Sequence, residues 1–292
     1  LRPPAPWPPS RRAARAPRAR PRRGCVWVLA VPPRPAADFA LIIVGGAGSP
    51  AMSTPRLFLD APLAEGADLP GTPAQAHHLG TVLRRGAGDA VAVFNARDGE
   101  FAARITALRK DRCAFALGVR SRAPAPEPDL RLVVAALKRD ALDWVVEKAT
   151  ELGVSVIQPV TTRRSVVDRV NTDRLAAIAR GAAEQCERLS VPLVHPAVPL
   201  HAVLDAWDGA PLLVAAERRA AAPVRDIAAT LRLPCGWLVG PEGGFDPAEL
   251  DDATRRAFVT AVALGPRILR AETAAVAGLA VLQALAGDWT AT

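Results

Sequence analysis

Residues 264–273 read LGPRILRAET, and this stretch decides how the rest of the chain is interpreted. It follows a mostly apolar run over 258–264, which indicates a buried strand that Gly265 and Pro266 end. Residues 274–285, AAVAGLAVLQAL, are apolar on nearly every side if they are helical. Such a helix must be enclosed by its own domain or by a partner.

The loop between this strand and this helix carries three charged side chains, Arg267, Arg270 and Glu272. In α/β proteins, ligands bind beyond the carboxyl ends of parallel strands. The loop is therefore a candidate site. An ordinary strand–loop–helix with solvated charges fits the same letters and stays open as an alternative.

A second strand–loop–helix signal lies at residues 237–250, WLVGPEGGFDPAEL. We expect the strand to end at Gly240 and the next helix to be capped by Asp246, with Pro247 at its first position. Glycines at a strand end allow the backbone to approach a ligand closely. Their spacing fits neither a dinucleotide fingerprint nor a P-loop, so the pattern suits a purine-ribose group contacted by backbone atoms, or simply a tight turn.

The net charge of +8 belongs to residues 1–51, which contain nine arginines, no lysine and one aspartate. The other residues are balanced, with 28 basic and 28 acidic side chains, so the high isoelectric point is no argument that the folded part binds nucleic acid. Residues 1–51 are also rich in proline, and we expect them to be a disordered leader upstream of a natural start at Met52. Within them, residues 45–51 (GGAGSPA) imitate a dinucleotide motif, but Pro50 interrupts the helix that should follow.

The composition narrows the classes of protein. A chain of 292 residues can form one large or two modest domains, and no apolar run is long enough to span a membrane. The four cysteines have no C-x-x-C spacing, and the four histidines do not have the spacing of metal ligands. We therefore expect a cytoplasmic protein without a structural metal or disulfides.

Residues 52–122 predict a small closed or half-closed β-barrel. Strands are expected at 56–60, 90–95, 101–108 and 112–119, a helix at 74–83, and a hairpin turn at Asp98-Gly99. Between 84 and 122 there are nine basic and four acidic residues, which indicates either a phosphate-contacting face, with Arg84 and Arg85 as candidates, or a merely solvated surface.

The prolines of residues 123–128 (APAPEP) predict a stiff linker, after which residues 129–292 alternate between strand and helix patterns. This alternation predicts an α/β fold with a parallel sheet covered on both faces. The expected strands are 130–137, 154–160, 212–216, 236–240 and 259–264, and the expected helices are 141–152, 174–189, 200–207, 247–257 and 274–285.

Taken together, these motifs resemble the bacterial 16S ribosomal RNA (uracil-N3)-methyltransferases of the RsmE type, in the SPOUT superfamily. The resemblance covers residues 52–289 and leaves residues 1–51 unmatched. It is carried by GPEGGF and LGPRILRAETA, by RDALDWVVEKATELGV at 139–154 and EQCERLSVP at 184–192, and by PRLFLD at 55–60 and HHLGTVLRRGAGD at 77–89.

The resemblance implies a PUA-like RNA-binding β-barrel followed by a methyltransferase domain with a C-terminal trefoil knot, working as a homodimer. It implies S-adenosylmethionine as cofactor and, as substrate, the uracil at position 1498 of 16S ribosomal RNA in the small subunit. The residues it assigns to the cofactor are Leu238, Gly240, Glu242, Gly243, Leu264, Gly265, Ile268 and Leu269.

The implied chemistry needs a proton acceptor, because uracil N3 is a poor nucleophile until its proton leaves, and a cationic or N–H partner for the resulting anion. Glu272 and Glu242 are the candidate acceptors, and Arg270 is the candidate partner of the uracil anion or of a phosphate. Alternatively, Glu272 caps the last helix and Arg270 pairs with it.

Further RNA contacts are expected at Arg163, Arg164, Arg188 and Arg267. The family usually has a glycine where this chain has Glu187 and an arginine where it has Ser190. This chain therefore gains an acidic side chain at residue 187 and lacks a basic one at residue 190, and both changes would weaken contact with a phosphate there. Two other functions remain as competitors: a nicotinamide dehydrogenase that would use residues 45–51, and an RNA-binding assembly factor with the same fold and no catalysis.

Overall fold

The structure is a computed structural model that describes residues 54–167, 169–216 and 220–290. The expectations for residues 1–51, for Met52 as the natural start and for the glycine motif at 45–51 lie outside the described residues.

The first domain is a five-stranded sheet in the order β1-β3-β4-β5-β2. Its strands are β1 (Arg56–Phe58), β2 (Asp68–Pro70), β3 (Ala90–Asn95), β4 (Gly99–Leu108) and β5 (Cys113–Arg122). The predicted hairpin is present: β3 and β4 pair in antiparallel fashion, and Gly99, with φ of 92°, stands opposite Asn95. The sheet curves over one apolar core that includes Leu57, Val93 and Phe115.

The helix predicted at 74–83 forms as two successive pieces, α1 (Pro73–His77) and a π-helical turn η1 (His78–Val82). Thr72 and Gln75 form a capping box at its start, which fixes the entry of the chain into the helix. Arg84 then has φ of 52° and ends the helical region.

The second domain contains an eight-stranded sheet in which every neighbouring pair is parallel. Its order is β11-β13-β10-β12-β6-β7-β8, and β9 also pairs with β7. The strands are β6 (Leu130–Ala135), β7 (Val156–Thr161), β8 (Leu193–Val194), β9 (Val198–Pro199), β10 (Leu212–Ala215), β11 (Ala222–Pro223), β12 (Cys235–Val239) and β13 (Val259–Ala263). All five predicted strands are present, while the three two-residue strands were missed because two residues have no readable period.

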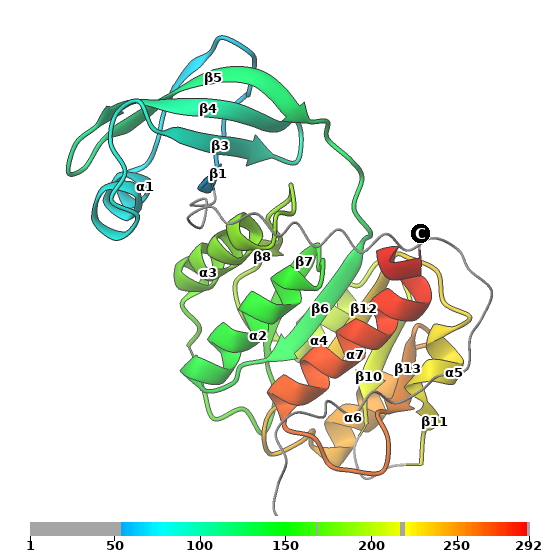
Figure 1. Ribbon diagram of the computed structural model, residues 1–292. Coiled ribbons are helices and arrows are strands. Elements are labelled where there is room, and N and C mark those ends of the chain that lie inside the picture. The colour runs from blue at the N-terminus through cyan, green and yellow to red at the C-terminus, as the bar shows by residue number, and fades with distance from the viewer. Residues whose placement is uncertain (1–53, 168, 217–219, 291–292) are drawn as a thin grey trace, which may run out of the picture. The chain divides into compact units, whose positions relative to one another are not determined.

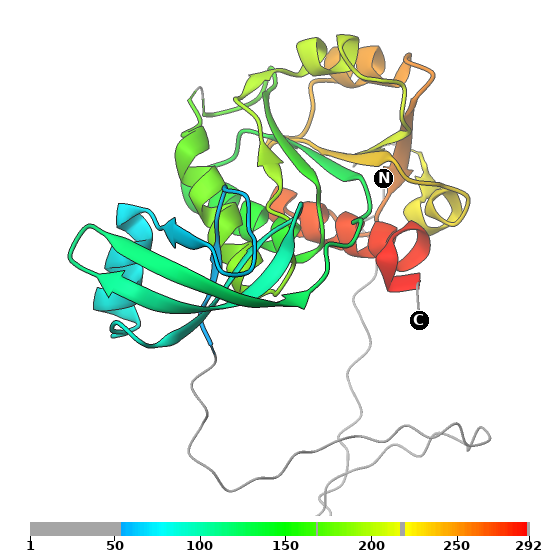
Figure 2. The same ribbon diagram turned by 90° about the horizontal axis from the view of Figure 1, so that it is seen from above.

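Helices cover both faces of this sheet, as predicted. They are α2 (Arg139–Glu151), α3 (Thr172–Gln185), α4 (Leu200–Asp205), α5 (Val224–Ala228), α6 (Pro247–Thr254) and α7 (Ala271–Ala286), with the 3-10 turn η2 (Asp288–Thr290) after the last. Alternate residues of β12 separate the two cores: Trp237 and Val239 face the core under α2, α3, α5 and α7, whereas Leu238 faces the core under α4 and α6. Figure 1 shows α2 and α7 on one face, and the turned view in Figure 2 places α4 and α6 on the other.

Helix α7 packs closely on the sheet through Gly278. The indole of Trp237 lies so near that a Cβ on Gly278 would be 2.1 Å from the ring, and Trp237 Nε1 donates a hydrogen bond of 3.2 Å to the carbonyl of Ala274. The helix is not enclosed on all sides by its own chain, because Ala284 and Leu285 are exposed. Of the two alternatives that the sequence left open, enclosure by the helix's own domain is incomplete, and enclosure by a partner stays a prediction.

Hydrogen bonds join the two domains at the end of α3. The Arg56 guanidinium pairs with Glu100 at 2.7 Å and donates to the carbonyls of Ala183, Glu184 and Arg188. The carboxylate of Glu184 accepts from the N–H of Phe58 at 3.0 Å. The end of α3 therefore supplies acceptors for the first strand of the barrel.

Candidate functional site

A pocket of about 170 Å³ lies at the carboxyl ends of three adjacent strands, β10, β12 and β13, and is closed by the first turn of α7. It lies where the two glycine loops of the sequence meet, although they are more than twenty residues apart in the chain. Its lining residues are Ala215, Ala216, Val239, Gly240, Pro241, Glu242, Gly244, Phe245, Val262, Ala263, Leu264, Gly265, Pro266, Arg267, Ile268, Leu269, Ala271 and Ala274.

The first loop takes its shape from glycine and from the cap of α6. Gly244 has φ of 68° and its N–H donates to the carbonyl of Pro241 at 2.8 Å, which closes a tight turn. Asp246 caps α6, as predicted, by accepting from the N–H groups of Ala248 and Glu249. Gly240 leaves room for the Phe245 ring, since a Cβ there would be 2.8 Å from it.

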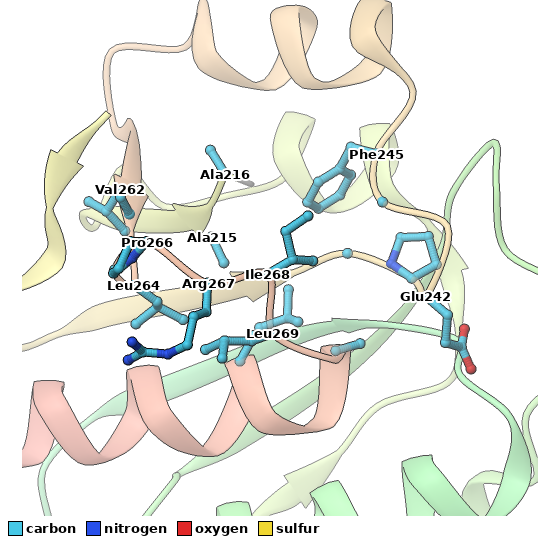
Figure 3. Close-up of a pocket in the computed structure, with 18 residues that line it drawn as sticks. Ala215, Ala216, Glu242, Phe245, Val262, Leu264, Pro266, Arg267, Ile268 and Leu269 are labelled. Atoms are coloured by element: carbon cyan, nitrogen blue, oxygen red, sulfur yellow. The ribbon is translucent and has the colours of Figure 1, made fainter. Parts of the chain in front are cut away.

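The second loop begins at Gly265, whose φ of 107° lets the chain turn away from β13. Figure 3 shows the side chains of Phe245 and Ile268 facing each other across the pocket, with Glu242 at one end and Arg267 at the other. Ile268 is 64% exposed, which is unusual for an isoleucine and leaves its side chain available to a ligand.

The pocket therefore has apolar walls, backbone groups from two loops and one charge at each end. Glu242 is tied to the neighbouring strand end, because its Oε1 accepts from the backbone N–H of Lys138 at 3.3 Å. A flat heterocycle with polar edges fits such a site better than a polyphosphate, because a polyphosphate would need several cations.

Most of the predicted cofactor residues come together here. Gly240, Glu242, Leu264, Gly265, Ile268 and Leu269 line the pocket. Leu238 does not: its side chain is fully buried in the core on the opposite face of the sheet. Gly243 also stands outside, exposed and next to Arg164.

Among the predicted catalytic residues, only Glu242 lines the pocket. Arg270 is the N-cap of α7 with its side chain 85% exposed, and its Nη1 is 3.9 Å from Oε1 of Glu272 in the first helical turn. A carboxylate in the first turn of a helix also interacts favourably with the helix dipole. In this structure the pairing of Arg270 with Glu272, left open by the sequence, is the arrangement present.

The arginines predicted to contact RNA have different surroundings. Arg84 is exposed, Arg85 is half-buried and Arg267 lines the pocket. Arg163 and Arg164 are exposed and lie against the first pocket loop.

Arg188 is instead buried, with only 8% of its side chain exposed. Its guanidinium donates to the carbonyls of Thr150 and Val154 and pairs with Glu127 and the Ser190 hydroxyl. This position speaks against the expected RNA contact, because the guanidinium is almost fully buried and its two terminal nitrogens already bind four groups of the same chain.

The sequence reasoning missed several residues of the pocket. Ala215 and Ala216 end strand β10, and Phe245 and Pro266 complete the two loops. The end of the predicted strand at 212–216 was a usable signal, because carboxyl ends of parallel strands share one edge of the sheet. Their adjacency needed the strand order, which the sequence does not contain.

The described ranges contain neither a cluster of metal ligands nor a helix that could span a membrane. Residues 54–167, 169–216 and 220–290 contain no group of three or more histidine, cysteine, aspartate or glutamate side chains placed to hold a metal ion. In the same part of the chain, no helix has the length and apolar character needed to cross a bilayer.

Comparison with known proteins identifies the family. The model described as an RNA methyltransferase domain matches residues 124–283, and the model described as an RNA methyltransferase PUA domain matches residues 72–117. The ribosomal RNA small subunit methyltransferase E of Rickettsia conorii is 32% identical over 232 residues, which is 79% of this chain and 95% of that protein. The chain belongs to the ribosomal RNA small subunit methyltransferase E family. Its PUA-like first domain and its methyltransferase domain are thereby confirmed, while the trefoil knot stays a prediction.

Solved structures agree with this membership. The small subunit methyltransferase E of Neisseria gonorrhoeae, bound to S-adenosyl methionine, is 31% identical and superposes with a TM-score of 0.72 over 81% of this chain and 99% of that one. A putative methyltransferase of Legionella pneumophila, also in complex with S-adenosylmethionine, is 29% identical with a TM-score of 0.73 over 80% of this chain and 99% of that one. This chain thus shares its fold with both solved structures over nearly their whole length.

Proposed function

We propose that the protein methylates N3 of a uridine in 16S ribosomal RNA, the uracil at position 1498, with S-adenosylmethionine bound in the pocket between the two glycine loops. The observation that carries this proposal is the pocket itself, in which six of the eight residues assigned to the cofactor meet at one edge of the sheet. The reaction class follows from the family, and the cofactor and substrate follow from the relatives' names and bound ligand.

The residues present fit this cofactor. Gly240 lets the Phe245 ring lie directly against the loop backbone at the pocket, and apolar side chains such as Phe245 and Ile268 suit the flat face of an adenine. Glu242 suits a hydroxyl or ammonium group at one end. When bound, the cofactor supplies an activated methyl group.

The chain's own residues must bind the uracil, remove its N3 proton and balance the anion that forms. Glu242 is the better placed acceptor, because it lines the pocket whereas Glu272 does not. Arg267 lines the pocket and Arg270 stands in the same loop, so these two cations are available for the uracil anion or for a phosphate.

A matched pair of variants tests the assignment. Glu242→Gln should reduce the formation of 3-methyluridine on purified small subunits by at least 100-fold, whereas Glu272→Gln should reduce it by less than 10-fold. Nucleoside mass spectrometry of the 16S RNA measures both. If Glu272→Gln is the more damaging change, the roles of the two carboxylates are reversed.

The second test separates the enzyme from a non-catalytic RNA-binding factor with the same fold. Calorimetry with S-adenosylmethionine should show one site per chain for the unmodified protein. If no heat of binding is detected at millimolar cofactor, the assembly-factor function replaces the enzymatic one.

We further propose a cytoplasmic homodimer formed through α7. On this helix Leu285 is 39% exposed beside the exposed Ala284, and Trp144 of the neighbouring α2 is 42% exposed. Leu285→Glu should shift the mass in solution, measured by light scattering, from dimer to monomer. Leu193→Glu, at a 58% exposed leucine on β8, is the control and should leave the mass unchanged.

A further inference from the structure

The loop that follows β7 is folded into a tight turn that presents two arginines. The N–H of Ser165 donates to the carbonyl of Thr162 at 3.1 Å, and the Ser165 hydroxyl accepts from the N–H of Thr162 at 3.0 Å. Between them, Arg163 and Arg164 project with 65% and 47% of their side chains exposed. These bonds fix the backbone of the turn and leave both guanidinium groups open to an anion.

Four contacts fasten this turn to the first pocket loop and to the first turn of α6. Arg163 Nη1 donates to Asp246 Oδ1 at 3.0 Å, and Arg164 Nη2 is 3.9 Å from Oδ2 of the same carboxylate. Arg164 Nη1 also donates to the carbonyl of Gly243 at 3.3 Å, and the backbone N–H of Arg163 donates to Glu249 Oε1 at 3.2 Å. The arginine turn thus touches the middle of the glycine loop and the first turn of α6.

Asp246 has two tasks at once. Besides the two arginines, it accepts from the N–H groups of Ala248 and Glu249 as the cap of α6. Partial burial acts to raise the pKa of Asp246, but its hydrogen bonds from Glu249, Ala248 and Arg163 outweigh this and lower the pKa, so the carboxylate is charged at neutral pH. One charged group therefore connects the end of the pocket loop to the arginine turn.

We propose that Asp246 is a positioning residue that couples RNA binding to cofactor binding. It holds Arg163 and Arg164 against the loop 240–246, so an RNA phosphate that binds the turn also stabilises the pocket form of the loop. A cofactor in the pocket orders the same loop and, through Asp246, the turn. The inference rests on the proposed RNA methylation and adds a residue that touches neither the reacting atoms nor the pocket.

The coupling is reciprocal by thermodynamic necessity: the factor by which cofactor tightens RNA equals the factor by which RNA tightens cofactor. Coupling of this kind ranges from about 5-fold to about 150-fold. A guanidinium carries five donors, so Arg163 can retain Asp246 and still bind a phosphate. The arrangement therefore favours cooperative binding rather than competition between Asp246 and the RNA.

Asp246→Asn separates the two tasks of this residue. Asparagine caps helices about as well as aspartate, so α6 keeps its cap while the charge facing the arginines is lost. The measurement is the dissociation constant of a short 16S RNA hairpin, with and without saturating S-adenosylhomocysteine, for the full chain. We expect the unmodified protein to bind RNA at least 5-fold more tightly with the cofactor product, and Asp246→Asn to show less than a 2-fold difference.

Asp252→Asn is the matched control, because Asp252 lies on the same helix and pairs with Arg255 and Arg256 rather than with the turn. It should keep the coupling factor of the unmodified protein. In addition, Asp246→Asn should raise the KM for RNA in methylation assays more than it lowers kcat, a split that a merely unfolded variant would not show.

The outcomes are distinct. The inference is overturned if Asp246→Asn has the same coupling factor as the unmodified protein. It is also overturned if the RNA affinity of the unmodified protein does not change when the cofactor product is added. If the unmodified protein binds no cofactor product at all, the proposed function itself fails, and the inference falls with it.

Discussion

Glu187→Gly should make the protein more stable, although it removes a charged surface side chain. Glu187 is the second residue after α3 and has φ of 64°, a left-handed conformation that L-residues avoid. Helices commonly end with such a residue, and it is usually glycine.

The magnitude follows from two opposing terms. A side chain in the left-handed region costs about 1–2 kcal/mol, whereas the greater freedom of glycine in the unfolded chain costs about 0.5–1 kcal/mol. The net expectation is a gain of about 0.5–1 kcal/mol in the free energy of unfolding. The carbonyl of residue 187, which accepts from Arg122 Nη1 at 2.7 Å, is retained in the variant.

The assay is thermal and urea unfolding followed by circular dichroism. For a protein of this size the expected gain corresponds to an increase in Tm of about 1–4 °C. Ala229→Gly is the control: Ala229 also follows a helix, α5, but has φ of −61°, so glycine there should lower the stability. If the Glu187→Gly variant is no more stable than the unmodified protein, the left-handed backbone at residue 187 does not cost the stability expected.

Three further predictions concern buried or half-buried positions. Gly278→Ala should destabilise the fold by about 1–3 kcal/mol in urea unfolding, because its Cβ would lie 2.1 Å from the Trp237 ring; an unchanged midpoint would contradict this close packing. Gly240→Ala should weaken S-adenosylmethionine binding at least 5-fold in calorimetry with little change in Tm, since the new methyl group displaces the Phe245 ring that lines the pocket. Burial raises the pKa of Glu184 in the folded state above its unfolded value, so the native protein loses stability as pH rises through that folded pKa. Glu184→Gln should therefore gain in unfolding free energy, relative to the unmodified protein, as pH rises from the unfolded to the folded pKa of Glu184, and a difference that does not change with pH would argue against the assignment.

Local patterns were sufficient for much of the fold. The alternation of strands and helices after residue 129 predicted the parallel sheet, and the Asp98-Gly99 pair predicted the hairpin between β3 and β4. Asp246 was expected as the cap of α6 and is its cap. These features depend on residues close together in the chain, whose turn, cap and period preferences act locally.

The roles of charged side chains were not predictable in the same way. Arg188 looked like an RNA ligand in the sequence, yet its guanidinium is buried among backbone carbonyls and Glu127, more than sixty residues away in the chain. The hydroxyl of Ser190 also donates to Glu127. The packing of Glu127 in the linker against residues 188–190 is what holds these two side chains inside the structure, and no local pattern in the chain indicates it.

By itself, the sequence determined the two-domain α/β organisation and the two glycine loops that form the candidate site, because period, glycine and capping signals are read over a few residues. The tertiary structure alone decided that β10, β12 and β13 end side by side, and that Glu242 rather than Glu272 lines the pocket they form. Strand order and the direction of a side chain arise from contacts between distant segments, and neither has a local signal in the chain.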